Sequence, residues 1–202
     1  EARILGGLGH LQRAFGHFSQ SETLYQQAQA LFQQVGDDIG VGNIWIGLGH
    51  LELLRGNHQS SRNYFNKAMT SFKKMGNPRG ESYSLLGLGK LDYYINNYHT
   101  SQIAYEKALS LSKQEGDPLG EAMALLGLAS IERITSHINK ANMLYEQALN
   151  LFRKLGRPIE EASTLLGWAE LNYNLSQYEI AERKYQQSLS IFKNLNNKEG
   201  EA

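Results

Sequence analysis

Apolar residues recur along the chain at intervals of three and four, the spacing that places side chains on one face of a helix. Leu125, Leu128 and Ile131 form one such stripe, and a second stripe follows about twenty residues later, built on Tyr145 and Ala148. The pattern returns every forty residues, most clearly in Gly-Leu-Gly at 7–9, 47–49 and 87–89, Gly-Leu-Ala at 127–129 and Gly-Trp-Ala at 167–169. The sequence therefore predicts five repeats of two helices each, without an insertion between them.

Capping residues set the expected limits of these helices. Asp117 followed by Pro118 supplies a side-chain cap and then a proline whose missing N–H is harmless at the first helical position. Asn77 and Asp37 are the equivalent caps, whereas Arg157 has lost that function. The first helix of a repeat is expected to end near residues 95, 135 and 175, and a glycine in the left-handed conformation should follow the second helix at 36, 76, 116 and 156.

The repeats are expected to form one array over residues 1–202. Their limits are 1–37, 38–77, 78–117, 118–157 and 158–197, and residues 198–202 would start a further helix. Neither end carries the polar face of a capping repeat, so we expect the chain to be part of a longer protein.

Glycine in the middle of the first helix costs about 1 kcal/mol of helix propensity. The cost makes sense if neighbouring helices approach closely there. Small residues on the second helices would supply the matching contact: Ser21, Ser61, Ser101, Ala141 and Ala181. The sequence thus predicts that contacts between small residues set the geometry of stacking.

The composition of the chain excludes several kinds of function. Lys plus Arg and Asp plus Glu are equal at 20 each, so no overall field favours nucleic acid or an anionic membrane. Cysteine is absent, which excludes disulfides and thiol chemistry. No apolar run reaches the length of a membrane span. We expect a cytoplasmic protein with no membrane or nucleic-acid partner.

The fourth unit resembles the tetratricopeptide repeat. The matching residues are Leu125, Leu128 with Ala129, Ser136, Ile138, Ala141, Tyr145 and Ala148, and the resemblance extends over all five units. The unit of forty residues departs from the family's about 34, and a polar column replaces an aromatic of the first helix: Gln12, Glu52, Asp92, Glu132 and Asn172. The resemblance implies an all-α fold, a right-handed α-solenoid of antiparallel helix-turn-helix units. It also implies a non-catalytic protein whose concave wall, formed by the first helices, holds a peptide or helix of a partner.

Wall positions carried over from the family give the candidate binding residues. They are His10, Arg13, Asn43, His50, Leu54, Tyr83, Lys90, Tyr93, Tyr94, Arg133, Ile134 and Tyr173. The tyrosines are candidate anchors, because tyrosine offers a large ring with a polar tip, although packing between helices is the alternative. Some relatives grip chaperone C-terminal carboxylates with Lys, Asn and Arg in this groove. The comparable places here hold Gly6, Ile46 and Leu86 and then His10, His50 and Lys90, so that activity is not expected.

Other chemistry has little support in the sequence. His10 and His50 should lie one helix spacing apart, and no histidines stand at i and i+4, so no metal or other cofactor is expected. The polar column forms a ladder along successive repeats, whereas acid–base catalysis needs two carboxyls in one cleft. We expect its members to hydrogen-bond to a neighbouring helix end, and the Gly-Leu-Gly block lacks the strand and lysine of a nucleotide loop.

The sequence favours an interaction scaffold within a larger signalling or regulatory protein. Two alternatives stay open. The first is a structural module that associates with itself through its uncapped ends. The second is a regulatory domain that senses a ligand or peptide and acts on an attached enzyme.

Overall fold

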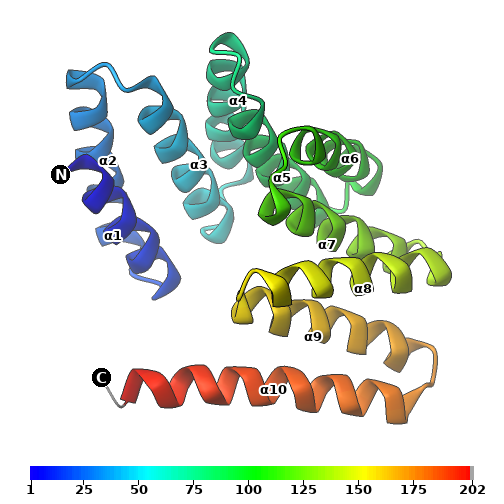
Figure 1. Ribbon diagram of the computed structural model, residues 1–202. Coiled ribbons are helices and arrows are strands. Elements are labelled where there is room, and N and C mark those ends of the chain that lie inside the picture. Colours follow the sequence, from blue (N-terminus) through cyan, green and yellow to red (C-terminus); the bar gives the residue numbers. More distant parts are fainter. Residues whose placement is uncertain (201–202) are drawn as a thin grey trace. The chain divides into compact units, whose positions relative to one another are not determined.

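The computed structural model describes the backbone of residues 1–200 and the side chains of residues 1–195. In this part the chain forms ten α-helices in five helix-turn-helix pairs (Figure 1). The pairs are α1 (Ala2–Ala14) with α2 (Phe18–Gln34), α3 (Asp38–Leu54) with α4 (His58–Lys74), α5 (Pro78–Tyr94) with α6 (Tyr98–Gln114), α7 (Pro118–Ile134) with α8 (Ile138–Lys154), and α9 (Pro158–Asn174) with α10 (Tyr178–Gly200). This confirms the predicted all-α solenoid of five pairs. Helix α10 runs to Gly200, and residues 201 and 202, the end of the further helix expected from 198, lie outside the described residues.

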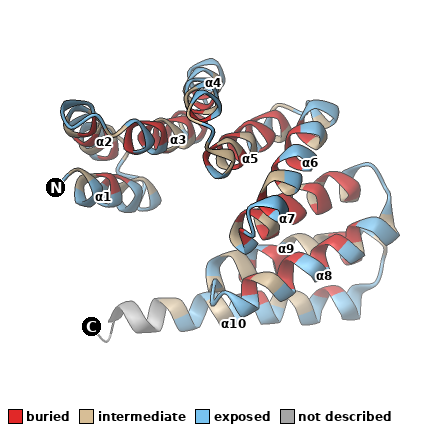
Figure 2. Cartoon of the chain, turned by 45° about the horizontal axis from the view of Figure 1, so that its top comes forward, coloured by how far each residue is buried: buried red, intermediate tan, exposed pale blue. Residues whose placement is uncertain are grey.

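The helices group into two compact units, Glu1–Glu115 and the residues from Gly116 onward. In the first unit α2 packs on α1 and α3, and α4 packs on α3 and α5. The first helices also touch one another, α1 with α3 and α3 with α5. In the second unit α8 packs on α7 and α9, and α9 packs on α10. Within each unit, a second helix therefore lies against the first helix of its own repeat and, where the unit holds a further repeat, against the first helix of that repeat. Each helix buries one face in these contacts (Figure 2).

The predicted helix limits agree with the structure. The side chains of Asp37, Asn77 and Asp117 accept hydrogen bonds from the backbone N–H three residues on, at 2.8, 2.9 and 3.3 Å. Arg157 makes no capping bond. The glycines expected after the second helices have positive φ, and so do the glycines that follow α1 and α3. Their φ values lie between 61° and 79°: Gly16, Gly36, Gly56, Gly76, Gly116 and Gly156. Asn96, Ser136 and Ser176 take this strained conformation where the later first helices end.

The glycines in the first helices make room for aromatic rings. Tyr25 lies between Gly9 and Gly47, where an added Cβ would approach its ring carbons to 2.7 and 2.9 Å. Phe65 lies in the same way between Gly49 and Gly87. Real Cβ atoms essentially never come within 3.0 Å of such atoms. The ring of the second helix therefore rests directly on the backbone of two first helices, which only glycine permits.

The predicted contact between small residues exists, but it does not by itself explain why the first helices need glycine. Ser21, Ser61 and Ser101 donate hydrogen bonds to the carbonyl oxygens of Gly9, Gly49 and Gly89, at 2.8, 2.8 and 2.7 Å. These bonds tie a small residue of the second helix to the glycine of the first. The close approach of the helices is not the whole reason for glycine, because the large ring beside the serine also excludes a Cβ.

A second ring position follows the same rule. Phe72 lies between Gly42 and Gly80 and is fully buried. In the next repeat Ser112 replaces the ring, and its partner is Ser82, with the two hydroxyl oxygens 2.7 Å apart. Large side chains thus meet glycine, and a small polar side chain meets another.

Four members of the polar column are buried, whereas Gln12 is partly exposed. Glu52 accepts hydrogen bonds from Arg55 and from Asn57, both at 2.8 Å. Glu132 accepts from His137 at 2.7 Å and pairs with Lys140 at 2.5 Å. Burial opposes the charge of Glu132, but the hydrogen bonds from Lys140 and His137 outweigh it and lower the pKa of the carboxyl.

Three members of the column reach the end of the next helix, as predicted. Their partners are the N-cap residues of α2, α4 and α8: His17 bonds to Gln12, Asn57 to Glu52 and His137 to Glu132. Asp92 instead pairs with Arg62 of the preceding repeat at 2.5 Å. The column therefore stabilises the turns and the contact between repeats.

The packing of rings on glycine gives a matched test. We expect Gly87→Ala to lower the free energy of unfolding by about 1–3 kcal/mol, because its methyl group would overlap the Phe65 ring. Gly7 holds the equivalent place in the first repeat, and a Cβ there would meet nothing within 4 Å. Gly7→Ala should therefore raise the free energy of unfolding by up to about 1 kcal/mol through helix propensity. Urea unfolding followed by circular dichroism measures both, and equal effects of the two substitutions would contradict this account.

Candidate functional site

The residues predicted to bind a partner all lie on first helices, and each keeps part of its surface exposed, although the imidazoles of His10 and His50 and the Lys90 amine are largely desolvated. In the first unit they stand on α1 (His10, Arg13), α3 (Asn43, His50, Leu54) and α5 (Tyr83, Lys90, Tyr93, Tyr94). In the second unit Arg133 and Ile134 stand on α7, and Tyr173 on α9. Large apolar or aromatic side chains among them are strongly exposed: Tyr94 at 58%, Tyr173 at 57% and Leu54 at 51%.

The tyrosines divide between surface and packing roles. The Tyr93 ring is half-buried and contacts Tyr98 of α6 edge-on, with ring centroids 5.9 Å apart. Tyr94 meets Tyr93 at 6.2 Å but leaves most of its ring exposed. Tyr173 is similarly exposed and contacts Tyr178 at 5.6 Å. Tyr94 and Tyr173 thus leave most of their rings open to solvent, whereas Tyr93 contributes to packing between helices.

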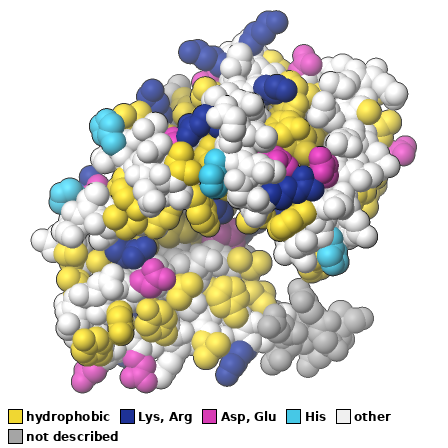
Figure 3. Space-filling model, turned by 180° about the vertical axis from the view of Figure 1, so that it is seen from behind, with side chains coloured by type: hydrophobic (Ala, Val, Ile, Leu, Met, Phe, Trp, Pro, Cys, Tyr) yellow, Lys and Arg dark blue, Asp and Glu magenta, His cyan; other side chains and the backbone are white. Residues whose placement is uncertain are grey.

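Basic side chains recur at one repeat position of the first unit. His10, His50 and Lys90 stand at equivalent places on α1, α3 and α5, and Arg13 follows His10 by one turn. We call these residues the basic column. The space-filling view shows apolar, basic and acidic side chains interspersed over the face that it presents (Figure 3). In the second unit the equivalent places hold Ser130 and Glu170, so the basic column belongs to the first unit alone.

The core rings position the histidines. His10 Nδ1 lies 2.8 Å from the hydroxyl oxygen of Tyr25, and their rings meet edge-on with centroids 5.2 Å apart. His50 packs edge-on against Phe65 with centroids 5.0 Å apart. Tyr25 and Phe65 are the rings held between glycines in the core. The contacts that stack the repeats therefore also fix the orientation of the histidines.

The electrostatic environment of the basic column is wholly positive. Burial, followed by the charges of Lys90, Arg13 and His10, lowers the pKa of His50 to about 3. Burial and then the Arg13 charge lower the pKa values of His10 and of Lys90. These shifts favour the neutral forms of His10, His50 and Lys90, because each is desolvated and lies near other positive charges.

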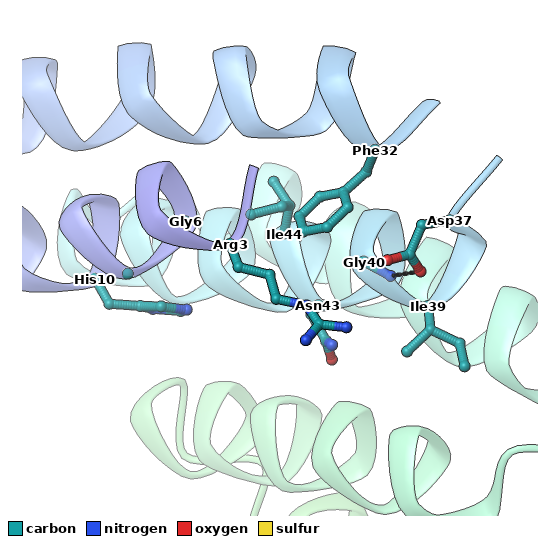
Figure 4. Close-up of a pocket in the computed structure, with 10 residues that line it drawn as sticks. Arg3, Gly6, His10, Phe32, Asp37, Ile39, Gly40, Asn43 and Ile44 are labelled. Carbon is teal, nitrogen blue, oxygen red and sulfur yellow. Dashed lines mark hydrogen bonds between the residues drawn. The ribbon is translucent and has the colours of Figure 1, made fainter. Parts of the chain in front are cut away.

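A pocket of about 440 Å³ adjoins His10. Arg3 and Asn43 contribute polar groups to its lining, and Phe32 and Ile44 contribute apolar ones (Figure 4). Asp37 also lines the pocket, but its carboxylate is engaged in capping Gly40. The pocket can take an apolar side chain next to a polar group.

Sequence reasoning did not find this pocket. The signal for it was Gly6, a wall position that has no side chain and that lines the pocket. A Cβ there would lie 3.1 Å from Ile44 Cδ1, so any larger residue would fill the hollow. The exposed Ile39, another lining residue, was not among the predicted positions.

The second unit presents different chemistry. Arg133 Nη2 lies 3.3 Å from the Glu170 carboxylate, so that its charge is compensated. Among the described residues, no three His, Asp or Glu side chains are grouped so that they could hold a metal ion. No helix in the described part is both long and apolar enough to cross a membrane.

Comparison with known proteins places the chain among repeat proteins. Residues 1–74 match the sequence model of the tetratricopeptide repeat family. A comparison with curated proteins finds no match.

Solved structures share the fold over nearly the whole chain at low sequence identity. BtubC from P. vanneervenii matches with a TM-score of 0.72 and 17% identity, covering 95% of this chain and 80% of its own. A Signal Transduction ATPase with Numerous Domains that has a tetratricopeptide repeat sensor, from Pyrococcus horikoshii, matches at 0.75 and 19%, covering 98% of this chain and 30% of its own. A Rap protein complexed with Competence and Sporulation Factor matches at 0.73 and 12%, covering 97% and 64%. These likenesses support the fold alone.

The lowered pKa of His50 predicts how stability responds to acid. The unfolded chain takes up the proton near the ordinary pKa of 6.5, whereas the folded chain takes it up only near 3. Between these values the unfolded state binds more protons, so the His50 contribution to stability is present above 6.5 and is lost as the pH falls toward 3. His50→Gln removes this titration. The stability difference between wild type and variant should therefore shift in favour of the variant from pH 7 to pH 4, as urea unfolding would measure, and a difference independent of pH would contradict the burial of a neutral His50.

Proposed function

We propose that this chain, of which residues 1–74 match the tetratricopeptide repeat family, is a non-catalytic scaffold that binds a segment of a protein partner on its first helices. The observation that carries the proposal is the exposure of Tyr94 on α5 and of Leu54 on α3, two helices that bury most of their apolar residues. Exposed rings and aliphatic side chains beside half-buried polar groups are typical of binding surfaces.

The rigidity of the helices supports binding without rearrangement. Asp37 and Asn77 cap α3 and α5, and the rings of Tyr25 and Phe65 hold these helices through glycine contacts. A surface that is already ordered loses little conformational entropy when a partner binds. The partner segment would bear most of that cost.

The structural neighbours are compatible with a role in regulation. One carries its repeats as a sensor within a multidomain ATPase, of which this chain spans 30%, and another is complexed with Competence and Sporulation Factor. We propose that this chain likewise serves within a larger regulatory protein of the cytoplasm. In that setting, binding of a peptide could be sensed and passed on to an attached domain.

Binding of short segments can be tested by selecting random peptides of about fifteen residues against the purified chain. We expect enriched peptides, and Tyr94→Ala and Leu54→Ala should each weaken their binding about tenfold, because each removes an exposed apolar contact. Ile103→Ala is the control, since Ile103 is also exposed but lies on the second helix α6. Fluorescence anisotropy measures the affinities. Failure to enrich any peptide, or equal losses in all three variants, would refute binding at this surface.

Self-association is a second candidate, favoured by a site on α1. Gly47 and Gly87 each receive a ring from the preceding repeat, whereas the equivalent Gly7 has no atom near its Cβ position. Leu8 and Leu11 on the same helix are 41% and 47% exposed. At the other end, Leu189 of α10 is 52% exposed. A second copy of the chain could place a ring of α10 at Gly7, as adjacent repeats do.

Such stacking should depend on Gly7 and on protein concentration. If it occurs, the mass of wild type in light scattering should rise with concentration, and Gly7→Leu should reduce this rise because the side chain would occupy the open site. Thr23→Leu is the control, because it changes an exposed side chain on α2. Gly16→Ala would not serve, because Gly16 has positive φ and the substitution would strain the backbone. A monomer at every concentration would exclude this candidate.

A further inference from the structure

The second repeat carries two exchanges that no other repeat shares. The first helices hold leucine at 5, 85, 125 and 165, and the second helices hold leucine or isoleucine at 31, 111, 151 and 191. The second repeat instead has Trp45 and Ser71 at these places. Trp45 is partly buried and packs against the core of the first unit, and Ser71 is half-buried. A large ring on α3 is thus combined with a small polar side chain on α4.

Both residues line a pocket of about 570 Å³ at the junction of α3 and α4. The rest of the lining comes from α4 alone and consists of exposed polar and cationic side chains: Asn63, Asn66, Lys67, Thr70 and Lys74. A leucine at 71, as in the other repeats, is larger than serine, so the exchange leaves room in this lining.

The pocket offers hydrogen-bond donors and cations but no acid. The indole N–H of Trp45 has no partner within the described residues, whereas that of Trp168 donates to Asn142. Lys67 Nζ lies 5.7 Å from the centroid of the Tyr64 ring, a contact that orients the ammonium group and leaves its charge in place. The hydroxyls of Ser and Thr in the lining can also donate to a ligand.

The helix that forms most of the pocket has an unusual charge pattern. Among the second helices α4 alone lacks an acidic residue, and the place of Asn66 is held by Glu106 in α6 and by Glu146 in α8. Its cations are Arg62, Lys67, Lys73 and Lys74. The last two also complement the dipole at the helix C-terminus, but Lys67 stands two turns earlier.

Two of the acids on the helices that pack against α4 are bound to arginines. Glu52 of α3 pairs with Arg55 at 2.8 Å, and the same arginine holds Glu22 of α2. Asp92 of α5 pairs with Arg62 of α4. Arg62 is therefore compensated, and these acids are not available to the lysines of the pocket.

The other two acids of α3 and α5 stand in first helical turns. They are Asp38 and Glu81, and a negative charge is favourable there because of the helix dipole. In the described structure neither of them forms an ion pair with Lys67 or Lys74. The two lysines therefore present uncompensated charge beside the indole of Trp45.

We propose that the pocket lined by Trp45, Lys67, Ser71 and Lys74 is a second binding site, and that it binds an acidic segment of a partner protein. The site lies on a second helix and does not depend on the first-helix surface proposed above. Lys67 and Lys74 stand about 10 Å apart along the helix axis, so each would pair with a separate carboxylate. The indole and hydroxyl donors would bind the carboxylates or the backbone carbonyls between them.

Single-stranded nucleic acid matches this surface less well than an acidic peptide does. Its binding relies on aromatic rings on which bases stack and on cations that follow the backbone. The rings here belong to Trp45 and Tyr64, and both are partly buried against the core. Two lysines line the pocket, which suits a pair of carboxylates more than a run of phosphates.

The double variant Trp45→Leu and Ser71→Leu provides the test. It gives the second repeat the residues of the other repeats, so we expect it to fold, and it removes the indole donor and the room at 71. Random peptides of about fifteen residues would be selected against wild type and against this variant. Peptides that bind wild type alone should be rich in Asp and Glu. Lys67→Gln and Lys74→Gln should each weaken their binding about threefold in fluorescence anisotropy, as expected for an exposed ion pair.

The two tryptophans of the chain report directly on where such a peptide binds. In proton–nitrogen correlation spectra, a selected peptide should shift the indole signal of Trp45. The signal of Trp168, which is bonded to Asn142 in the second unit, should stay in place. The Trp45→Leu change in the double variant assigns the two signals.

Lys107→Gln is the matched control, because Lys107 holds the place of Lys67 on α6 but stands beside Glu106. It should leave the affinity unchanged. The inference would be overturned if no peptide distinguished wild type from the double variant, if such peptides showed no excess of acids, or if the Trp45 signal did not move. The first-helix proposal would then stand by itself. Tighter binding of a single-stranded oligothymidylate than of the acidic peptides would overturn the inference in favour of nucleic acid. If the double variant did not fold, the two lysine variants, which change exposed side chains only, would still decide.

Discussion

The contact of an aromatic ring with the backbone of a glycine is the constraint on which this structure depends. Tyr25 and Phe65 each lie against glycines of two first helices, and this fixes the distance between neighbouring repeats. The same rings contact His10 and His50 on the surface of the first helices. The core therefore determines the placement of the candidate site, and a change that displaced a ring would alter stability and surface together.

The two units use one scaffold with different surfaces. In the second unit alanines at 129 and 169 replace the second glycine of the block. Tyr145 stacks with Trp168 instead, with centroids 6.3 Å apart, and the indole N–H donates to Asn142 at 2.6 Å. Arg133 is paired with Glu170 there, whereas Arg13 and Lys90 have no acidic partner. Conserving the packing while varying the exposed positions lets equivalent helices carry different binding chemistry.

Much of the fold was predictable because its signals are local. The period of forty residues, the capping Asp37 and Asn77, and the glycines after second helices each follow from short stretches of sequence. The role of glycine in the first helices was less accessible, because Gly47 and Tyr25 meet only after the chain has folded. The alignment of His10, His50 and Lys90 could be read from the period. The absence of acidic partners for Arg13 and Lys90 could not be read from the sequence, because it depends on Glu52 and Asp92 pairing with Arg55 and Arg62 in the folded chain.

The buried acids Glu52 and Asp92 differ from the basic column in having partners of opposite charge. Glu52 and Asp92 are nearly fully buried, yet each has a cationic partner at short distance. The fold can therefore supply counterions where stability requires them. Arg13 and Lys90 lack such partners, and burial and mutual repulsion lower the pKa of Lys90. Sites that sacrifice stability in an otherwise well-satisfied structure are expected where function demands it, and the first helices of the first unit hold such a site at Arg13 and Lys90.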